Sequence, residues 1–272
     1  MRETRLRLAV LGSPIAHSKS PLLHAAAYRT LGLDWEYERH EVTDETLADF
    51  LAGLGPEWRG LSLTMPLKRR VAELVQDVDP VARATSQGNT ILLDAGRPVK
   101  AFNTDVHGVV AALQSAGVEA ATHAVVLGGG ATAESAVAAL RSMGGQVTVA
   151  VRDPQKVLDA GVFGAEIGVV ALREVESGIR EADVVVSTIP NAAEFTLPIP
   201  ERVHGTLLDV AYHPWPTALA SRWTDAGGRV VSGLEMLLHQ AVHQVRIFVN
   251  GDPGVELPDE AAVIRAMRAA VE

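Results

Sequence analysis

Short apolar runs alternate along this chain with longer segments in which apolar residues recur every three or four positions. Runs of the first kind predict β-strands, and segments of the second kind predict amphipathic helices. Strands are expected at residues 5–12, 35–42, 60–64, 89–94, 99–102, 124–127, 146–151, 169–171, 183–188, 206–210 and 229–231. This alternation favours an α/β fold in which helices cover parallel sheets.

The helical segments carry recognisable start and stop signals. Ser20 is predicted to cap the first helix, with Pro21 as its first residue, and Pro66 is predicted to open another. The proline-rich segment 212–216 is predicted to be neither helix nor central strand. The expected helices cover residues 21–31, 44–54, 66–75, 106–117, 134–143, 234–248 and 259–271, and residues 95–97 form the turn of a predicted hairpin.

Three consecutive glycines, Gly128, Gly129 and Gly130, separate a predicted strand from a predicted helix near the middle of the chain. With Ala133 they fit the pattern G-x-G-x-x-A of dinucleotide-binding turns. Glycine is suited to such a turn because backbone must approach a pyrophosphate without a Cβ in the way. The motif therefore indicates a phosphate site at a helix N-terminus, although taken alone it is also compatible with an ordinary glycine turn.

The strand after the glycine turn bears on which dinucleotide is bound. In this arrangement an acidic residue at the strand end binds the 2′-hydroxyl of NAD, whereas arginine accommodates the 2′-phosphate of NADP. Here Arg152 follows the predicted strand, and Lys156 lies one turn further on. Asp153 could instead accept from a ribose hydroxyl, and Arg152 could be a solvated surface residue. The sequence favours NADP.

Composition narrows the range of partners. The chain has 272 residues, 47% of them hydrophobic, which is enough for one large α/β domain or two smaller ones. Its net charge of −9 argues against nucleic acid or an anionic membrane as the main partner. There are no cysteines, so disulfides, zinc thiolate sites and cysteine nucleophiles are excluded. No stretch reaches the length of a membrane span, and a cytoplasmic protein is expected.

A two-histidine spacing, His239 and His243, matches that of helical zinc proteases, but Gln240 occupies the position of the glutamate base. No metal site is expected.

Candidate chemistry lies in the first part of the chain, where polar residues follow predicted strands or begin predicted helices. Ligands of open α/β sheets bind at such places. Lys68 and Asp105 form a lysine–carboxylate pair with a plausible acid/base role in ketone reduction. A solvated Lys68 and a helix-capping Asp105 are equally open from these residues alone. The full set is Ser18, Ser20, Thr64, Lys68, Asn89, Asn103, Thr104 and Asp105.

Five segments resemble motifs of the shikimate dehydrogenase family, in the same order and across nearly the whole chain. They are GSPIAHSKSP at 12–21, LTMPLK at 63–68, NTDVHG at 103–108, DVAY with WPT at 209–217, and SGLEMLLHQA at 232–241. The resemblance implies NADPH-dependent reduction of 3-dehydroshikimate to shikimate, and the reverse, in aromatic amino acid biosynthesis. A quinate/shikimate or related cyclitol-acid dehydrogenase that uses NAD, and a non-catalytic dinucleotide sensor, are the alternatives.

By position, the resemblance implies that Lys68 and Asp105 are the catalytic pair. It implies a substrate site of Ser18, Ser20, Thr64, Asn89, Tyr212 and Gln240, and a cofactor site of Gly128, Gly129, Gly130, Ala131, Thr132, Arg152, Lys156, Thr188 and Gly233. It also implies a substrate domain of residues 1–106 and 234–272, to which the last helices return, and a Rossmann-type NADP domain of residues 107–233. A homodimer is compatible with these expectations.

Overall fold

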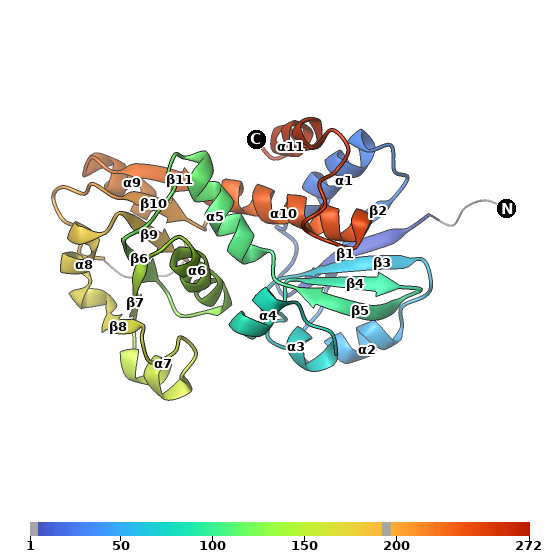
Figure 1. The fold of residues 1–272 in the computed structure, drawn as a ribbon, viewed down its shortest axis with the longest axis horizontal. Helices are drawn as coiled ribbons and strands as arrows, with labels where there is room; N and C mark the ends of the chain where they lie inside the picture. The colour runs from blue at the N-terminus through green and yellow to red at the C-terminus, as the bar shows by residue number, and fades with distance from the viewer. Residues whose placement is uncertain (1–4, 192–196) are drawn as a thin grey trace. The chain divides into compact units, whose positions relative to one another are not determined.

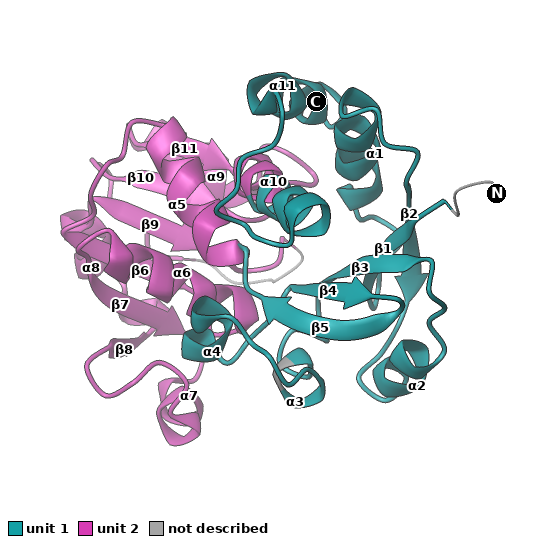
Figure 2. Cartoon of the chain, turned by 45° about the vertical axis from the view of Figure 1, so that its right-hand side comes forward, with its two compact units in different colours: residues 1–104, 240–272 teal, residues 105–239 magenta. Residues whose placement is uncertain are grey.

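The computed structural model of the chain describes residues 5–191 and 197–272. It contains two β-sheets, each covered by helices (Figure 1). The chain divides into two compact units, unit 1 with residues 1–104 and 240–272 and unit 2 with residues 105–239 (Figure 2). The predicted α/β fold, with two sheets and C-terminal helices that return to the first unit, is confirmed.

The sheet of unit 1 has five strands in the order β2-β1-β3-β4-β5. β1 is parallel to β2 and β3, whereas β4 is antiparallel to both β3 and β5, so the sheet is mixed. β4 and β5 form the predicted hairpin, and Ala95 and Gly96 both have positive φ at its turn. The strands are β1 Arg7–Gly12, β2 Glu36–Glu41, β3 Trp58–Leu63, β4 Thr90–Asp94 and β5 Arg97–Phe102.

Helices from both ends of the sequence build the rest of unit 1. Apolar side chains of β1, β3 and β4 pack with those around α2 and α3 in one core. α10, which begins in unit 2, contributes its residues from Gln240 onward. The helices are α1 Ser20–Thr30, α2 Leu47–Ala52, α3 Val71–Leu74, α4 Pro80–Thr85, α10 Gly233–Asn250 and α11 Glu260–Ala269.

The structure corrects two predicted helix starts. α1 begins at Ser20 itself, after Lys19, and no side chain caps it. Ser20 is already in the first turn, and its backbone N–H donates to Ser18 Oγ at 3.3 Å. Pro66 does not open a helix either, since residues 65–70 form turns and α3 begins only at Val71. Leu67 N donates to Thr64 O at 2.9 Å, a bond between residues three apart that closes a turn and not an α-helix.

The sheet of unit 2 has six parallel strands in the order β11-β10-β9-β6-β7-β8. Read from β8, the unit's own strand order is 3-2-1-4-5-6, the order of dinucleotide-binding folds. The strands are β6 His123–Leu127, β7 Gln146–Val151, β8 Gly168–Ala171, β9 Val184–Ser187, β10 Thr206–Asp209 and β11 Arg229–Ser232.

Helices cover both faces of this sheet. Val126, which packs with residues of α5 and α6, and Val125, which packs with α8 and α9, are consecutive residues that point to opposite faces. The sequence pattern predicted α5 and α6 but not α7, α8 and α9, nor α4 in unit 1. The helices are α5 Asp105–Ser115, α6 Ala131–Ser142, α7 Pro154–Ala160, α8 Glu176–Glu181 and α9 Ala218–Asp225, with a 3₁₀ turn at Leu172–Glu174.

Candidate active site

Two loops meet at the carboxyl edge of the first sheet. The parallel neighbours β1 and β3 end there at Gly12 and Leu63. A Cβ on Gly12 would overlap Thr64 Cγ2, so a residue without a side chain lets the loops approach this closely. The chain order of the strands reverses between β1 and β3, and open α/β sheets bind ligands at such a point.

The loop after β1 carries Ser18, and Ser20 follows it as the first residue of α1. At the start of α1, Ser20 N donates a hydrogen bond to Ser18 Oγ, and the Ser20 side chain is buried. Glu41, at the end of the neighbouring strand β2, accepts hydrogen bonds from Ser13 Oγ and, at 3.1 Å, from Ile15 N. The structure thus brings Ser18 and Ser20 together on a loop held by a strand-end carboxylate.

The segment after β3 is hydrogen-bonded to the end of β1 and to the residues that lead into β4. Thr64 N donates to Leu11 O at 2.9 Å, and Lys68 O accepts from Gly88 N at 2.8 Å. Asn89 follows Gly88 directly, at the start of β4. Since β4 runs antiparallel to β3, its beginning lies at the edge where β3 ends. Thr64, Lys68 and Asn89 are therefore gathered at one edge by the backbone.

Asn89, Thr104 and Gln240 form a buried hydrogen-bonded cluster. Asn89 Nδ2 lies 2.9 Å from Thr104 Oγ1 and 3.4 Å from Gln240 Oε1, and Asn89 Oδ1 accepts from Thr104 N at 2.9 Å. All three residues are at most 7% exposed. Gln240 enters from α10, 151 residues after Asn89. Amides held in this way can fix and discriminate the hydroxyl groups of a small polar ligand.

Two further predicted residues belong to unit 2. Asp105 is the first residue of α5 and is buried, and Tyr212 lies half-buried in the loop after β10. Burial raises the pKa of the Tyr212 phenol, which is therefore a neutral hydrogen-bonding group at physiological pH. The pairing of Asp105 with Lys68 stays a prediction.

The glycine turn lies at the point where the strand order of the second sheet reverses, between β6 and β9. Gly128 has φ of +113°, and a Cβ there would overlap Thr188 Oγ1. Thr188 Oγ1 in turn donates to Leu127 O at 3.0 Å. Gly128 and Thr188, predicted from distant parts of the chain, are thus brought into contact, and glycine is required for that contact.

The other glycines lead directly into α6. Gly130 precedes the helix without a side-chain cap, a Cβ on it would meet open space, and Ala131 and Thr132 form the first turn. A Cβ on Gly129 would be 3.0 Å from Val151 Cγ1, so this residue packs against the next strand. An uncapped helix start at a parallel-strand end is suited to binding phosphate.

The basic residues after β7 are exposed, as a site for a ligand phosphate at the surface requires. Arg152 follows the strand, and Lys156 lies in α7. Asp153 Oδ1 accepts from Lys156 N at 3.2 Å and caps α7. Asp153 is therefore a helix cap, and a role in cofactor binding for either Asp153 or Arg152 stays a prediction.

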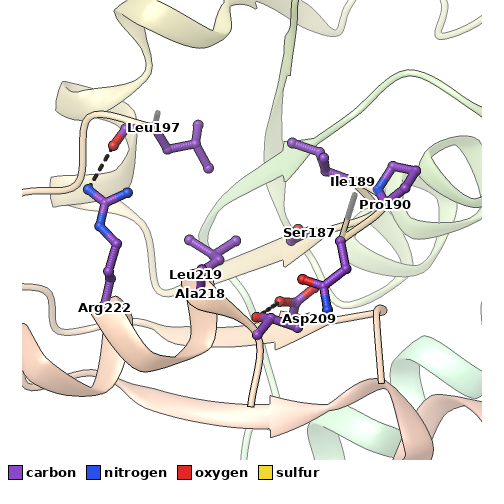
Figure 3. A pocket seen from close by; sticks show the side chains of 10 residues that line it. Ser187, Ile189, Pro190, Leu197, Asp209, Ala218, Leu219 and Arg222 are labelled. Atoms are coloured by element: carbon purple, nitrogen blue, oxygen red, sulfur yellow. Dashed lines mark hydrogen bonds between the residues drawn. The ribbon is translucent and has the colours of Figure 1, made fainter. Parts of the chain in front are cut away.

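A small cavity of about 100 Å³ opens beside the ends of β9 and β10 (Figure 3). Asp209 contributes a buried carboxylate that accepts from Thr217 Oγ1, and burial raises the pKa of this carboxyl group. Arg222 donates to Leu197 O at 2.9 Å on another side. The sequence pattern did not single out Asp209 or Thr217 as site residues, although a polar residue at a strand end was an available signal.

Gly233, the last of the predicted cofactor residues, starts α10 after β11. A Cβ on it would overlap Val210 O, so only glycine fits against the backbone of the loop after β10.

Comparison with known proteins decides the family. The family profile described as the shikimate dehydrogenase substrate binding domain matches residues 10–91, and that described as shikimate / quinate 5-dehydrogenase matches residues 111–197. A shikimate dehydrogenase (NADP(+)) of Thermus thermophilus is 33% identical over 98% of this chain and 99% of its own length. The chain belongs to the shikimate dehydrogenase family. The corresponding enzyme of Archaeoglobus fulgidus is 35% identical over 97% of this chain and 99% of its own.

Solved structures of the shikimate dehydrogenase family share the fold. The Mycobacterium tuberculosis enzyme is 40% identical, with a TM-score of 0.80 over 97% of this chain and 99% of its own. A Thermus thermophilus enzyme, solved in complex with NADP(H) and shikimate, is 34% identical, with a TM-score of 0.83 over 98% of this chain and all of its own.

Two kinds of feature are absent from the part of this family member that the structure describes. Within residues 5–191 and 197–272, no helix is long and apolar enough to cross a membrane. In the same residues, no group of three or more histidine, aspartate or glutamate side chains could hold a metal ion. His239, one of the two histidines with the zinc-protease spacing, has its Nε2 atom 3.1 Å from Ser115 Oγ.

Proposed function

We propose that this chain catalyses the NADP-dependent interconversion of 3-dehydroshikimate and shikimate by hydride transfer, in the shikimate pathway of aromatic amino acid biosynthesis. The observation that carries the proposal is the buried cluster of Asn89, Thr104 and Gln240 at the ligand-binding edge of the first sheet, in a member of the shikimate dehydrogenase family. Such a cluster suits a small polyhydroxylated ring.

The substrate residues divide by the group that each recognises. Ser18 and Ser20 bind the substrate carboxylate, since their loop brings two hydroxyl-bearing residues and a helix start together. The ring and its hydroxyl groups are contacted by Thr64, Asn89, Tyr212 and Gln240. This assignment is supported by the common edge at which Thr64, Asn89 and Gln240 lie.

Lys68 and Asp105 carry the proton chemistry. When bound, NADPH supplies a hydride to the substrate ketone. The Lys68 ammonium donates a proton to the oxygen that gains negative charge, so that the ketone becomes an alcohol, and Lys68 recovers its proton from solvent. The Asp105 carboxylate is the second member of this catalytic pair. Oxidation of shikimate runs through the same groups in reverse, with neutral Lys68 accepting the hydroxyl proton.

The cofactor residues fit a dinucleotide because a side chain at Gly128 would collide with Thr188 and because α6 starts uncapped. Gly128, Gly129, Gly130, Ala131 and Thr132 would hold the pyrophosphate. Arg152 and Lys156 would bind the 2′-phosphate, and Thr188 and Gly233 would complete the site.

Replacing Arg152 with alanine is expected to weaken NADP⁺ binding selectively. Loss of a hydrogen bond between a guanidinium and a phosphate should raise the Kd for NADP⁺ by roughly 10- to 100-fold and change the Kd for NAD⁺ little. Calorimetric titration with both cofactors measures the two values. Arg173→Ala, which removes an exposed arginine elsewhere in unit 2, is the matched control. Equal effects of Arg152→Ala on both cofactors would contradict contact with the 2′-phosphate.

The domain assignment separates the residues that bind substrate from most of those that bind the cofactor. Residues 1–106 and 234–272 form the substrate-binding and catalytic domain, and residues 107–233 form the NADP domain. The matches at residues 10–91 and 111–197 support this assignment. A homodimer and a cytoplasmic location are consistent with the proposed biosynthetic role; light scattering of the purified protein tests the first.

A spectrophotometric assay tests the function. Purified protein is offered shikimate or quinate with NADP⁺ or NAD⁺, and formation of the reduced cofactor is followed. We expect turnover of shikimate with NADP⁺. Faster turnover of quinate would establish the second candidate, a quinate/shikimate dehydrogenase, an activity included in the family description that matches residues 111–197. Absence of turnover in all four combinations would favour the remaining alternative, in which the chain is a non-catalytic dinucleotide sensor.

A further inference from the structure

A chain of buried polar groups extends from the substrate cluster into the interior of unit 1. Gln244 lies one helical turn after Gln240 on α10 and is 2% exposed. Its Nε2 donates to Asn89 O at 3.2 Å and to Thr90 Oγ1 at 3.0 Å. Thr90 Oγ1 then donates to Asn89 Oδ1 at 2.8 Å. Gln244 is therefore connected to the Asn89 amide through a single hydroxyl.

Two backbone groups fix the direction of every bond in this chain. Asn89 O can only accept, so the Gln244 atom facing it must be the nitrogen. Thr104 N can only donate, so the Asn89 atom facing it must be the oxygen. The Thr90 hydroxyl receives from Gln244 and therefore has its own proton for Asn89 Oδ1. The orientations of the Gln244 and Asn89 amides are therefore both determined by their bonds to backbone groups.

The other side of Gln244 is equally defined. Its Oε1 accepts from Ser62 Oγ at 2.9 Å and lies 3.2 Å from His24 Nε2. Because Oε1 cannot donate, His24 carries its proton on Nε2, and Nδ1 accepts from Tyr28 OH at 3.0 Å. Full burial lowers the pKa of His24 to about 3, so the ring is neutral at physiological pH and holds this tautomer.

We propose that Gln244 is a positioning residue that acts through Thr90 to hold the Asn89 amide in the orientation that substrate binding requires. This inference rests on the proposed function, in which Asn89 contacts a substrate oxygen. With Oδ1 accepting from both Thr90 and Thr104, Asn89 Nδ2 faces Thr104 Oγ1 and Gln240 Oε1. The Asn89 and Gln240 amides are thus held in one relative orientation, and this arrangement is the one that meets the hydroxyl groups of the substrate.

The test combines steady-state kinetics with a double-mutant cycle. Gln244→Met keeps the length of the side chain but removes both its donor and its acceptor, and Thr90→Val keeps the branched shape but removes the relaying hydroxyl. Each variant is expected to raise the KM for shikimate roughly tenfold, with kcat and the Kd for NADP⁺ close to the wild-type values. Both substitutions interrupt the same path from Gln244 through Thr90 to Asn89. The KM of the double variant should therefore equal that of either single variant, and the two increases should not multiply.

His24→Phe is the matched control. It removes a polar contact from the same Gln244 amide and keeps a ring stacked on Tyr37, yet it leaves the bonds from Gln244 to Asn89 and Thr90 in place. We expect lower thermal stability but an unchanged KM for shikimate.

Each other outcome counts against the proposal. An unchanged KM in Gln244→Met or Thr90→Val, a multiplicative double variant, or an equal KM increase in His24→Phe would overturn it. If Gln244→Met does not fold, Thr90→Val alone decides by the same criterion. If the wild type turns over neither shikimate nor quinate, the proposed function fails and this inference with it. Wild-type turnover with unaffected variants overturns the inference alone.

Discussion

Replacing Lys68 with alanine is expected to lower kcat for shikimate oxidation by about 10²–10⁴-fold, the usual loss when a general acid or base is removed. The side chain contributes a transferable proton at the reacting oxygen and is not assigned any contact with the cofactor. The Kd for NADP⁺ should therefore stay close to the wild-type value. Steady-state kinetics and cofactor titration on the same preparation measure both quantities.

Arg69→Ala is the matched control, because it removes a positive charge at the next, exposed position of the same turn. Its kcat should be nearly that of the wild type. Near-normal turnover by Lys68→Ala would remove Lys68 from the mechanism, and an equal loss in both variants would indicate that the turn, rather than the ammonium group, matters.

The second large effect is on stability in acid. His24 has a pKa of about 3 in the folded protein because it is fully buried, against an ordinary value of 6.5. Between these values the unfolded chain binds a proton that the folded protein does not, so stability rises with pH across this window. The contribution is fully present above about pH 6.5 and is lost toward pH 3, at about 1.4 kcal/mol per pH unit and a few kcal/mol in total.

Urea denaturation of the wild type and His24→Phe, at a series of pH values, isolates this contribution. Other histidines and the carboxylates titrate in both proteins and cancel in the difference. The free energy of unfolding of the wild type should fall more steeply than that of the variant as pH falls below 6.5. Parallel curves would mean that His24 gains its proton in the folded protein over the same pH range as in the unfolded chain.

The strands were predictable because most of them are apolar runs with clear boundaries. Every expected strand has a counterpart, including the weakly patterned Glu36–Glu41. The short helices were missed because about six to eight residues show too little periodicity. The starts of α4, α7 and α9 were nevertheless encoded, since Asp79, Asp153 and Thr217 each accept a hydrogen bond from the backbone N–H three residues later.

The site was predictable only in part. The glycine turn and Arg152 follow from local pattern, whereas the role of Gln240 came from family resemblance. Gln244 gave no local signal, because a glutamine in a helix is ordinarily a surface residue. Its bonds join it to Asn89 and His24, which are 155 and 220 residues away in the sequence. Only the folded chain brings those residues together.

The return of α10 and α11 to unit 1 has a consequence for synthesis on the ribosome. Lys19 Nζ donates to Val271 O across 252 residues, and Gly60 packs directly against the Phe248 ring. Unit 1 therefore begins to emerge first but cannot be completed until residues 240–272 have been made. Unit 2 is contiguous, so all of its residues are available before Gln240 is added. Unit 2 is thus the first that can finish folding, and the apolar surfaces of β3 and α1 that pack against α10 and α11 stay uncovered until residues 240–272 have been made.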